Sequence, residues 1–580
     1  MRLIKTSFDF SSEAIKKDDV FLGRWCCKEL NDLNNGNIIS NYHWDNRSKF
    51  YQDYLYLDIL YEQVLDEYVH ILNKIHNLNN NKRYWRIVFG PWLRFFIDIS
   101  FDRYEIIKSI AGKGQNVNIY KYDSTQWAPK SFLDFSNLIN NERWNEVIFS
   151  ECIKYLNISH SIKNHINILP EDAQINKKRN FNFYLKKIFS FYESCIPNSL
   201  NKVVIISAYM NLLDLAKLQI SIGQLPYLNG PMIEISDSKI NHVLRESIRS
   251  EPYLENFQHF IRSLIPLHIP KVYLENFLEF KSAVLAAYPK NPKTIFTSNA
   301  YQTDDAFKIW AAENTTNGKK LIIGQHGGNM GNALFNQTED HQIKIADKYA
   351  SWGWQSNSQP WVEPLPSLKL SNQNIKYKKN DRVAMILTSY PKYFYCHYSI
   401  PVADQFFLYL DNQVSFLNNL NSSIIKRLLI KPDPSFKDNS WDANVYISNK
   451  GFSENFIKTN KNMYDLLEES NLCICTNNTT TFLETLASNY PTIIFWDNAL
   501  FEIREDAVNE IRLLEDAGIL FYCPLKAANK VNDISKNIDK WWKEPALQKA
   551  VREFTDRYAL KSSSWVSEWK SFLIRDTSKK

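Results

Sequence analysis

Seven short apolar runs in the chain each end in, or lead directly into, small or polar residues, and a segment with helical periodicity follows each of them. They are KVVIIS (202–207), KTIFTSN (293–299), KLIIGQHGG (320–328), RVAMILTS (382–389), KRLLIKPDP (426–434), NLCICTNN (471–478) and PTIIFW (491–496). Continuous apolar strands that alternate with helices are typical of a parallel sheet covered on both faces. Because ligands bind beyond the carboxyl ends of such strands, the polar ends of these runs are the predicted site.

A chain of 580 residues exceeds what one hydrophobic core can organise, so we expect two or more domains. Residues 355–380, rich in proline and polar side chains, interrupt the strand–helix rhythm and are interpreted as a linker. The prediction is therefore an α/β fold of two Rossmann-like domains facing a cleft, residues 1–355 with a helical N-terminal elaboration and residues 380–540. Residues 541–580 are predicted to be helical and to return to the first domain.

Helical periodicity is strong over residues 51–78 and resumes near residue 84, whereas residues 115–200 carry the weakest signal in the chain. The N-terminus has no apolar leader, and no stretch of about 18 apolar residues occurs, so we predict a cytoplasmic protein. Eight cysteines without pairs at metal-binding spacing predict reduced thiols and no metal site.

The net charge of +6 is spread over 69 basic and 63 acidic residues without a basic block. This distribution argues against a nucleic-acid partner. A modest basic excess suits an anionic small substrate or peripheral contact with the inner membrane.

The strand-like run LIIGQHGG places His326 at a carboxyl end and follows it with Gly327 and Gly328. Glycines let the backbone approach a ligand with no Cβ in the way. A turn whose histidine only caps a helix is the alternative, but the flanking glycines and the strand-end position favour a ligand site.

Asp304 and Asp305 open a helix after the run at 293–299. Carboxylates in a first helical turn are favoured by the helix dipole, so simple capping explains them. If the runs at 293–299 and 320–324 are neighbouring strands, their carboxyl ends bring one of these carboxylates close to His326 as a catalytic pair. Both interpretations stay open.

In the second half, TNNTTTFLE follows a strand and opens a helix, which is the arrangement of an anion site for a nucleotide phosphate. An ordinary N-cap explains one of these polar residues but not the whole run. Lys431, at another strand end, either offsets phosphate charge or is simply exposed. The predicted nucleotide contacts are Lys431, Asn477, Asn478, Thr479, Thr480, Thr481 and Glu484.

Several charged residues lie in apolar surroundings and need partners. Arg94 and Arg103 bind either a substrate acid or the nearby Asp98 and Asp102, and the structural ion pair is favoured. FEIREDA (501–507) is expected to supply a salt link between the domains. The chain has no GxxxxGK[ST], GxGxxG, HExxH or GxSxG motif, which argues against kinases, nicotinamide dehydrogenases, zincins and serine hydrolases.

These segments together resemble the transferases encoded in bacterial surface-polysaccharide clusters that make nonulosonic acids. The matching pieces are FLGRWC, YWRIVFGPWLRFFID with DRYE, FTSNAYQTDDAFKIWAAE, GQHGGNMGNALFNQTEDHQIKIADKYASWGW, and TNNTTTFLETLASNYPTIIFW with EIREDA. They run in order from residue 21 to beyond residue 500. One departure is Met330, where an aromatic residue is expected, and this alters the contacts expected with a sugar.

That family is similar to bacterial Kdo and pseudaminic acid transferases, so the resemblance implies a GT-B fold and a CMP-activated keto-acid sugar, without metal or cofactor. It implies that His326 and either Asp304 or Asp305 line the sugar site and are catalytic. The substrate contacts expected with them are Gln325, Gly327, Gly328, Glu339, His341 and Arg94. The alternative for Glu339 and His341 is that they only cap a helix.

The expected function is transfer of a nonulosonic acid or Kdo-like sugar to a surface glycan, a lipid-linked glycan or a protein. Attack by a carboxylate on the anomeric carbon would retain configuration, the outcome favoured here, whereas proton removal alone would invert it. Two alternatives are a CDP-polyol phosphotransferase-like enzyme and a catalytically inactive polysaccharide-assembly protein.

Overall fold

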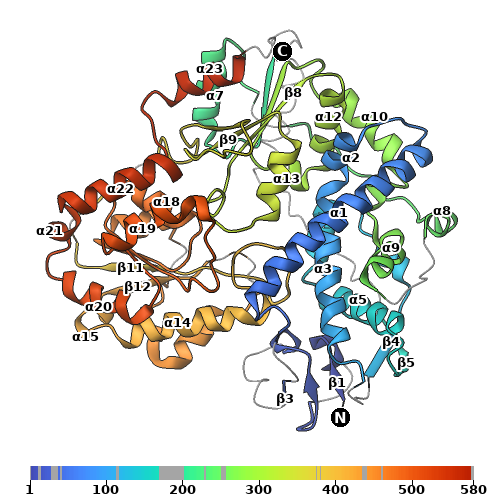
Figure 1. Cartoon of the computed structure of the whole chain (residues 1–580), viewed down its shortest axis with the longest axis horizontal. Helices are drawn as coiled ribbons and strands as arrows, with labels where there is room; N and C mark the ends of the chain where they lie inside the picture. The colour runs from blue at the N-terminus through green and yellow to red at the C-terminus, as the bar shows by residue number, and fades with distance from the viewer. Residues whose placement is uncertain are drawn as a thin grey trace.

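The computed structural model describes most of the chain, and Figure 1 shows its arrangement. The described residues are 2–10, 15–27, 37–38, 42–112, 117–168, 202–227, 230–249, 256–373, 375–378, 380–433, 435, 440–458 and 461–575. Residues 169–200, part of the stretch with the weakest sequence signal, lie outside them. In Figure 1 the N-terminal helices are on the right, one sheet is at the top and the elements of a second sheet are on the left.

Three consecutive helices form the frame of the N-terminal region. α1 (Arg47–His76) is a single helix, capped by the side chain of Asn46 and ended by Asn77 in the left-handed conformation, φ 52°. α2 (Lys82–Val88) and α3 (Gly90–Lys108) follow it. α3 is buried on nearly every side, as expected of a helix that is apolar all round. The predicted helical segments are confirmed, with a break between α2 and α3.

Shorter elements complete the N-terminal region. β1 (Leu3–Ile4), β2 (Val20–Phe21) and β3 (Asn37–Ile38) form a small parallel sheet, and β4 (Val117–Lys121) pairs in parallel with β5 (His160–Asn167). The helices here are α4 (Phe132–Leu138), α5 (Glu142–Tyr155), α8 (His242–Ser247), α9 (Phe257–His268) and α10 (Phe277–Ala287).

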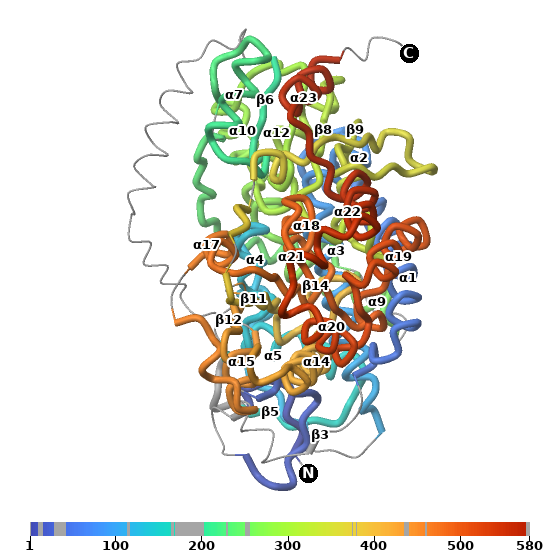
Figure 2. The backbone as a smooth tube through the Cα atoms, turned by 90° about the vertical axis from the view of Figure 1, so that its left-hand side faces the viewer, coloured from blue at the N-terminus to red at the C-terminus, as the bar shows by residue number. Residues whose placement is uncertain are grey.

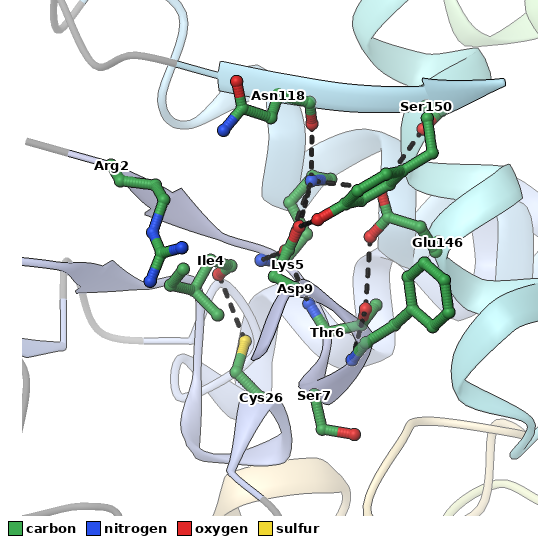
Figure 3. Close-up of polar contacts among 12 residues, drawn as sticks. Arg2, Ile4, Lys5, Thr6, Ser7, Asp9, Cys26, Asn118, Glu146 and Ser150 are labelled. Carbon is green, nitrogen blue, oxygen red and sulfur yellow. Dashed lines mark hydrogen bonds and ion pairs between the residues drawn. The ribbon is translucent and has the colours of Figure 1, made fainter. Parts of the chain in front are cut away.

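A buried charge cluster fastens the first strand to α5 (Figure 3). The Lys5 ammonium lies 3.2 Å from Asp9 Oδ1 and 3.0 Å from Glu146 Oε1, and it donates to the Asn118 carbonyl at 2.7 Å. Burial disfavours the charged lysine, but the two carboxylates outweigh burial and hold the pKa of Lys5 above its usual value. Burial raises the pKa of Glu146 to about 8, and Lys5 opposes this, so loss of the lysine would leave two buried carboxyl groups without their partner.

The first sheet has the strand order β10-β9-β8-β7-β6, all parallel. Its strands are β6 (Val203–Ile206), β7 (Thr294–Thr297), β8 (Lys320–Gly324), β9 (Lys348–Ser351) and β10 (Val362–Pro364). Its helices are α7 (Leu212–Ile222), α11 (Ala300–Thr303), α12 (Asp305–Thr316) and α13 (Gln337–Ile345). β10 lies within residues 355–380, the segment predicted as a linker, so part of that segment is an edge strand of the first sheet.

The second sheet is also parallel, in the order β12-β11-β13-β14-β15. Its strands are β11 (Val383–Ile386), β12 (Leu428–Lys431), β13 (Leu472–Cys475), β14 (Thr492–Phe495) and β15 (Leu520–Phe521). The chain reverses direction across the sheet between β11 and β13. Such a switch point opens a crevice beyond the carboxyl ends of the two strands, where ligands bind.

Helices cover the second sheet and lead to the C-terminus. They are α14 (Phe406–Asn418), α15 (Ser422–Ile425), α16 (Ala443–Ile447), α17 (Met463–Glu468), α18 (Thr480–Ala487), α19 (Val508–Asp516), α20 (Pro524–Ile534), α21 (Ile538–Trp542), α22 (Pro545–Tyr558) and α23 (Trp565–Ile574). α22 packs on α18 and α19, whereas α23 crosses to α7 of the first sheet (Figure 2). There the Trp569 ring lies 5.0 Å from that of Phe296.

The two sheets meet along their carboxyl ends. Residues 332–334 pair antiparallel with residues 502–504, where Leu334 N donates to Glu502 O at 2.9 Å. In addition, the loop after β11, residues 388–402, inserts among the N-terminal helices, and Arg103 donates to the Phe394 carbonyl at 3.0 Å. Two Rossmann-like domains that face each other across this junction confirm the predicted GT-B-like fold.

We expect Lys5→Met to cost about 3–5 kcal/mol, because it leaves two buried carboxylates side by side without their cation. Lys458→Met is the matched control, since its ion pair with Glu454 is exposed at 79% and 88% and should contribute little. Urea unfolding followed by tryptophan fluorescence measures both. Equal unfolding midpoints for the two variants would contradict the structural role of the charge cluster.

Candidate functional site

A pocket lies at the carboxyl ends of β6, β7, β8 and β9, and we call it the strand-end pocket. Its lining comprises Ala208, Tyr209, Ser298, Gly324, Gln325, Ala350, Trp352, Leu368, Lys369 and Trp569. Four consecutive strands of a parallel sheet thus deliver residues to one place, which is where α/β proteins bind their ligands. Lys369 comes from the crossing segment between the domains, and Trp569 comes from α23.

His326 follows β8 and adjoins this pocket. Its ring lies 6.0 Å from the Tyr209 ring and 6.3 Å from the Tyr301 ring, and Gln342 Nε2 is 3.5 Å from its Nδ1. Burial lowers the pKa of the His326 imidazole to about 4, and a backbone hydrogen bond with Ser298 only partly opposes this. His326 is therefore neutral near pH 7, with one nitrogen that donates and one that accepts.

The backbone entering the pocket is strained after β6. Ser207 and Tyr209 have φ values of 53° and 57°, in the left-handed region that non-glycine residues rarely occupy. Such conformations persist where the surroundings enforce them, and they cluster at functional sites. Here the strain presents the half-exposed Tyr209 ring to His326.

Gln325 was predicted to contact substrate, and its hydrogen bonds go to its own turn and to the segment that follows β9. Its Oε1 accepts from Trp352 N and Trp354 Nε1, both at 2.8 Å, and its Nε2 donates to the Gly327 carbonyl at 2.8 Å. These bonds hold the turn that carries His326. Gln325 thus orients the turn.

Gly328 joins this turn to the second domain. A Cβ at Gly328 would lie 2.5 Å from the carbonyl carbon and oxygen of Thr479, closer than real Cβ atoms approach any atom. At Gly327 the nearest atom, Met330 Cε, would be 4.0 Å away. Gly328 therefore permits the backbones of the two domains to pack against each other, whereas no backbone lies close enough to Gly327 to exclude a side chain.

The predicted anion turn lies directly across this contact, at the β11/β13 switch point. Asn477 Oδ1 accepts from Thr479 N at 2.9 Å, so this side chain shapes the turn. Asn478 is fully buried, and within the described part of the chain neither its Oδ1 nor its Nδ2 finds a hydrogen-bond partner. Thr480 and Thr481 begin α18 and are partly exposed. Burying an amide without a hydrogen-bond partner is costly, so the position of Asn478 needs an explanation.

Two further residues predicted to bind the nucleotide form their polar contacts with other protein groups. Glu484 is paired with Lys369 at 2.6 Å and accepts from the Tyr464 hydroxyl at 2.8 Å. Lys431 Nζ donates to the Lys461 carbonyl at 2.8 Å. The Glu484–Lys369 pair ties α18 to the strand-end pocket, and Lys369 also lies 5.0 Å from the Tyr209 ring.

Asp304 and Asp305, the carboxylates predicted to be catalytic, both form contacts with other protein groups. Asp304 Oδ1 accepts from Phe307 N at 2.9 Å and caps α12. Asp305 is only 4% exposed, and it accepts from the Tyr273 hydroxyl and lies 2.7 Å from Lys308 Nζ. No hydrogen bond or ion pair joins either carboxylate to His326 among the described residues. Their contacts favour the capping interpretation for Asp304 and a buried ion pair for Asp305.

Glu339 and Arg504 form an ion pair across the domain junction. Arg504 Nη2 lies 2.7 Å from Glu339 Oε1, while Glu339 Oε2 accepts from Gly331 N at 2.6 Å. A second link joins Arg47 of α1 to Glu502 at 2.6 Å. The salt link predicted for residues 501–507 is confirmed, and Glu339 supports the turn that carries His326.

Arg94 and His341 lie together on the helical side of the junction. Arg94 pairs with Asp98 at 2.9 Å, and Arg103 pairs with Asp102 at 2.6 Å, which confirms the structural ion pairs favoured from the sequence. Arg94 and His341 both line recesses between helices.

Sequence reasoning missed Tyr209, Ser298, Tyr301 and Lys369. The runs IISAY and IFTSN end in polar residues, as LIIGQHGG does. Treating the end of every predicted strand as part of the site would therefore have identified Tyr209 and Ser298. The sequence around Lys369 gives no sign that this residue lies in a pocket, because its position depends on how the interdomain segment crosses the junction. Within the described residues no group of three or more potential ligands could hold a metal ion, and none of the described helices could cross a membrane.

A family model described as LIC12162 family transferase matches residues 1–573. Among solved structures, the chain is similar to Acinetobacter baumannii MurG, with 11% identity, a TM-score of 0.34, and 64% of this chain and 98% of MurG covered. It is also similar to the spinosyn rhamnosyltransferase SpnG in complex with spinosyn aglycone, with 10% identity, a TM-score of 0.27, and coverage of 51% and 80%. None of the curated proteins compared with it matches the chain.

We expect Gly328→Ala to lower the free energy of unfolding by about 1–3 kcal/mol, because its Cβ must push the Thr479 backbone away. Gly327→Ala, which meets open space, should stay within about 0.5 kcal/mol of the parent. Thermal melts of both variants test this. The contact does not hold the domains together if both variants melt with the parent protein.

Proposed function

Because the chain belongs to the LIC12162 family of transferases, we propose that it is a glycosyltransferase. In this proposal it moves a nonulosonic acid or Kdo-like keto-acid sugar from a CMP-activated donor to a surface glycan, a lipid-linked glycan or a protein, without a metal. The donor class rests on the resemblance of the sequence segments, and the site geometry supports a nucleotide-linked ligand that spans both domains.

The observation that carries the proposal is the buried, unpartnered amide of Asn478 opposite the strand-end pocket. Asn478 precedes α18, whose N-terminal N–H groups and dipole favour an anionic group. The Asn478 amide offers an N–H donor, which a phosphate ester needs, and a carbonyl acceptor, which the amino group of a nucleotide base needs. Because Gly328 packs on Thr479, the sugar pocket and the anion turn lie next to each other.

In the proposed complex, Lys369 faces the donor's carboxylate or phosphate, with Glu484 holding the ammonium in place. A lysine ammonium is a compact point charge that binds phosphate and carboxylate groups. Tyr209 packs against the sugar. His326, being neutral, donates a hydrogen bond to the leaving phosphate or to a sugar hydroxyl.

Asp304 and Asp305 act in this proposal as positioning residues, because their contacts stabilise the start of α12 and its packing on the helical region. The alternative, in which one of them attacks the anomeric carbon with retention, requires the carboxylate to leave these partners. Asp304 is the better candidate of the two, since Asp305 is held by a buried lysine. Asp304→Asn with full transfer activity would remove the carboxylate from the chemistry.

We expect CMP to raise the melting temperature more than UDP, GDP or CDP. A ligand at about 100 times its Kd adds about 2.7 kcal/mol of stability. Asn478→Ala should abolish the shift. Asn444→Ala should keep it, because the Asn444 side chain is exposed on α16. Turnover of CDP-glycerol without turnover of a CMP-sugar would favour the phosphotransferase alternative. Absence of any nucleotide shift would favour an inactive assembly protein.

The low pKa of His326 gives a second prediction. The unfolded chain takes up a proton near pH 6.5 but the folded protein only near pH 4, so stability is lost as pH falls between these values. His326→Gln should remove this loss, at most about 3 kcal/mol, and should lower kcat/KM about 100-fold at pH 7.5. Urea unfolding at pH 7.5 and 4.5, with transfer assays, measures both. An acid limb of kcat/KM near pH 6.5 in the parent would contradict a neutral His326.

A further inference from the structure

A pocket with about 340 Å³ of cavity space lies against α19, and we call it the α19 pocket. Sites for small molecules measure about 300–1,000 Å³. Because one water takes up about 30 Å³ in the liquid, this space holds about ten waters, or a ligand with about a dozen carbon and oxygen atoms. A single sugar ring is of this size.

Three segments at the carboxyl end of the second sheet form the α19 pocket. Asn498, Glu502 and Ile503 follow β14, and Tyr522 follows β15. α19 contributes one helical face, made by residues 508, 511, 512 and 515. The predicted anion turn follows β13, which pairs with β14, so the α19 pocket lies at the ligand-binding edge of the same sheet.

One part of the wall is apolar. It consists of Ile503, Val508 and Ile511, together with the partly buried ring of Tyr522. The Tyr522 ring lies 6.2 Å from the Trp496 ring at an interplanar angle of 66°, and this edge-to-face packing fixes its orientation. An aromatic ring beside aliphatic side chains suits a ligand with one apolar face, such as the face of a sugar ring that carries its C–H groups.

The charges of the pocket balance one another. Glu502 is held by Arg47, whose Nε and Nη2 donate to its two oxygens at 2.6 and 2.8 Å. Of the remaining charges, the Glu515 carboxylate raises the pKa of the Tyr522 hydroxyl and the Arg512 guanidinium lowers it, so both act on the same place. An anionic ligand would be attracted by Arg512 and repelled by Glu515, and a cation the reverse. The balance favours a ligand without net charge.

The polar groups of the pocket are available to a ligand. Within the described part of the chain, the side chains of Asn498, Arg512 and Glu515 form no hydrogen bond or ion pair, so a ligand can bind them without breaking a protein contact. Arginine donates, a carboxylate accepts and an amide does both, which matches hydroxyls that donate and accept. An amino acid also has no net charge, but its ammonium and carboxylate would leave the apolar wall unused.

The wall of the α19 pocket continues into the turn that carries His326. Ile503 pairs with Ala333, and Arg504 N donates to the Asn332 carbonyl at 2.9 Å. Asn332 Nδ2 in turn donates to the Gly328 carbonyl at 2.9 Å. The α19 pocket is therefore next to the proposed transfer site, but this pair of backbone segments separates the two.

From this arrangement we propose that the α19 pocket binds a neutral saccharide unit, with its hydroxyls on Asn498, Arg512 and Glu515 and its apolar face toward the wall that contains Tyr522. The inference rests on the proposed function for the origin of this unit, a part of the acceptor glycan away from the hydroxyl that reacts. It gives the second domain a saccharide site that is distinct from the donor site at Asn478 and Lys369.

Ligand-observed NMR on the full chain tests this proposal with glucose, galactose, mannose, rhamnose and N-acetylglucosamine. Glucuronic acid and glucosamine serve as an anionic and a cationic sugar, and glycine serves as a zwitterion. At least one neutral sugar should bind, more tightly than the charged sugars and glycine. Saturating CMP should leave that sugar bound.

Variants locate the bound sugar. Arg512→Ala and Glu515→Ala should each weaken binding about three- to tenfold, the loss of one hydrogen bond, and should melt with the parent because neither side chain has a described partner. Val508→Trp should abolish binding, since Val508 is 37% exposed and an indole there fills the pocket. Asp516→Ala is the matched control, because Asp516 is exposed on α19 next to Glu515 but does not line the pocket.

The proposal is overturned if no neutral sugar binds, if glycine or a charged sugar binds more tightly than every neutral sugar, or if Val508→Trp binds sugar as tightly as the parent. Displacement of the sugar by CMP would place it in the donor site and would also overturn the proposal. The CMP thermal shift is read separately. A CMP shift without sugar binding defeats this inference alone, and sugar binding that Val508→Trp abolishes, without a CMP shift, defeats the proposed donor alone.

Discussion

The contact between Gly328 and the Thr479 backbone is the constraint on which the candidate site depends. Two backbones can pack at this distance only where one residue has no Cβ, and this contact brings the turn that carries His326 against the start of α18. The strand-end pocket and the anion turn become one site because of it. The Glu339–Arg504 and Arg47–Glu502 ion pairs support the same junction. Neither domain contains the site alone.

Charge pairing decides which buried groups remain for ligands. Arg94, Arg103, Asp305 and Lys5 all have partners of opposite charge, as buried ions require. Near the junction, three uncharged side chains have polar atoms without a described partner: both amide atoms of Asn478, Nε2 of Gln337 and Nε2 of His341. Removing a buried ion partner should therefore destabilise the fold, whereas removing the Asn478 amide should affect binding.

The sheets could be predicted from the sequence because their strands are continuous apolar runs with a clear period. β9 and β10 were missed because KYAS and VEP are too short and too polar to stand out. They are strands because β9 pairs with β8 and β10 pairs with β9. Pairs close in sequence, such as Arg94 with Asp98, were predictable from helical spacing.

The surroundings of Asp305 were not predictable, since its partners Tyr273 and Phe132 N come from distant segments. A strand-end rule located His326 and the 476–481 turn but could not say which side chains face a ligand. Asn477 and Asn478 are adjacent in sequence, yet one shapes the turn and the other has no described partner. That difference arises from tertiary packing.

The loop after β11 has a consequence for how this molecule moves. His397 packs against the rings of Trp44 and Phe50, and Gln405 donates to the Trp44 carbonyl at 2.8 Å, so the second domain is anchored among the N-terminal helices. A hinge about the crossings near residue 370 and between α22 and α23 would have to pull this anchor out of an aromatic core. We therefore expect the two domains not to open and close widely during turnover. Substrates would enter a cleft that is already assembled, through local movements of the loops above it.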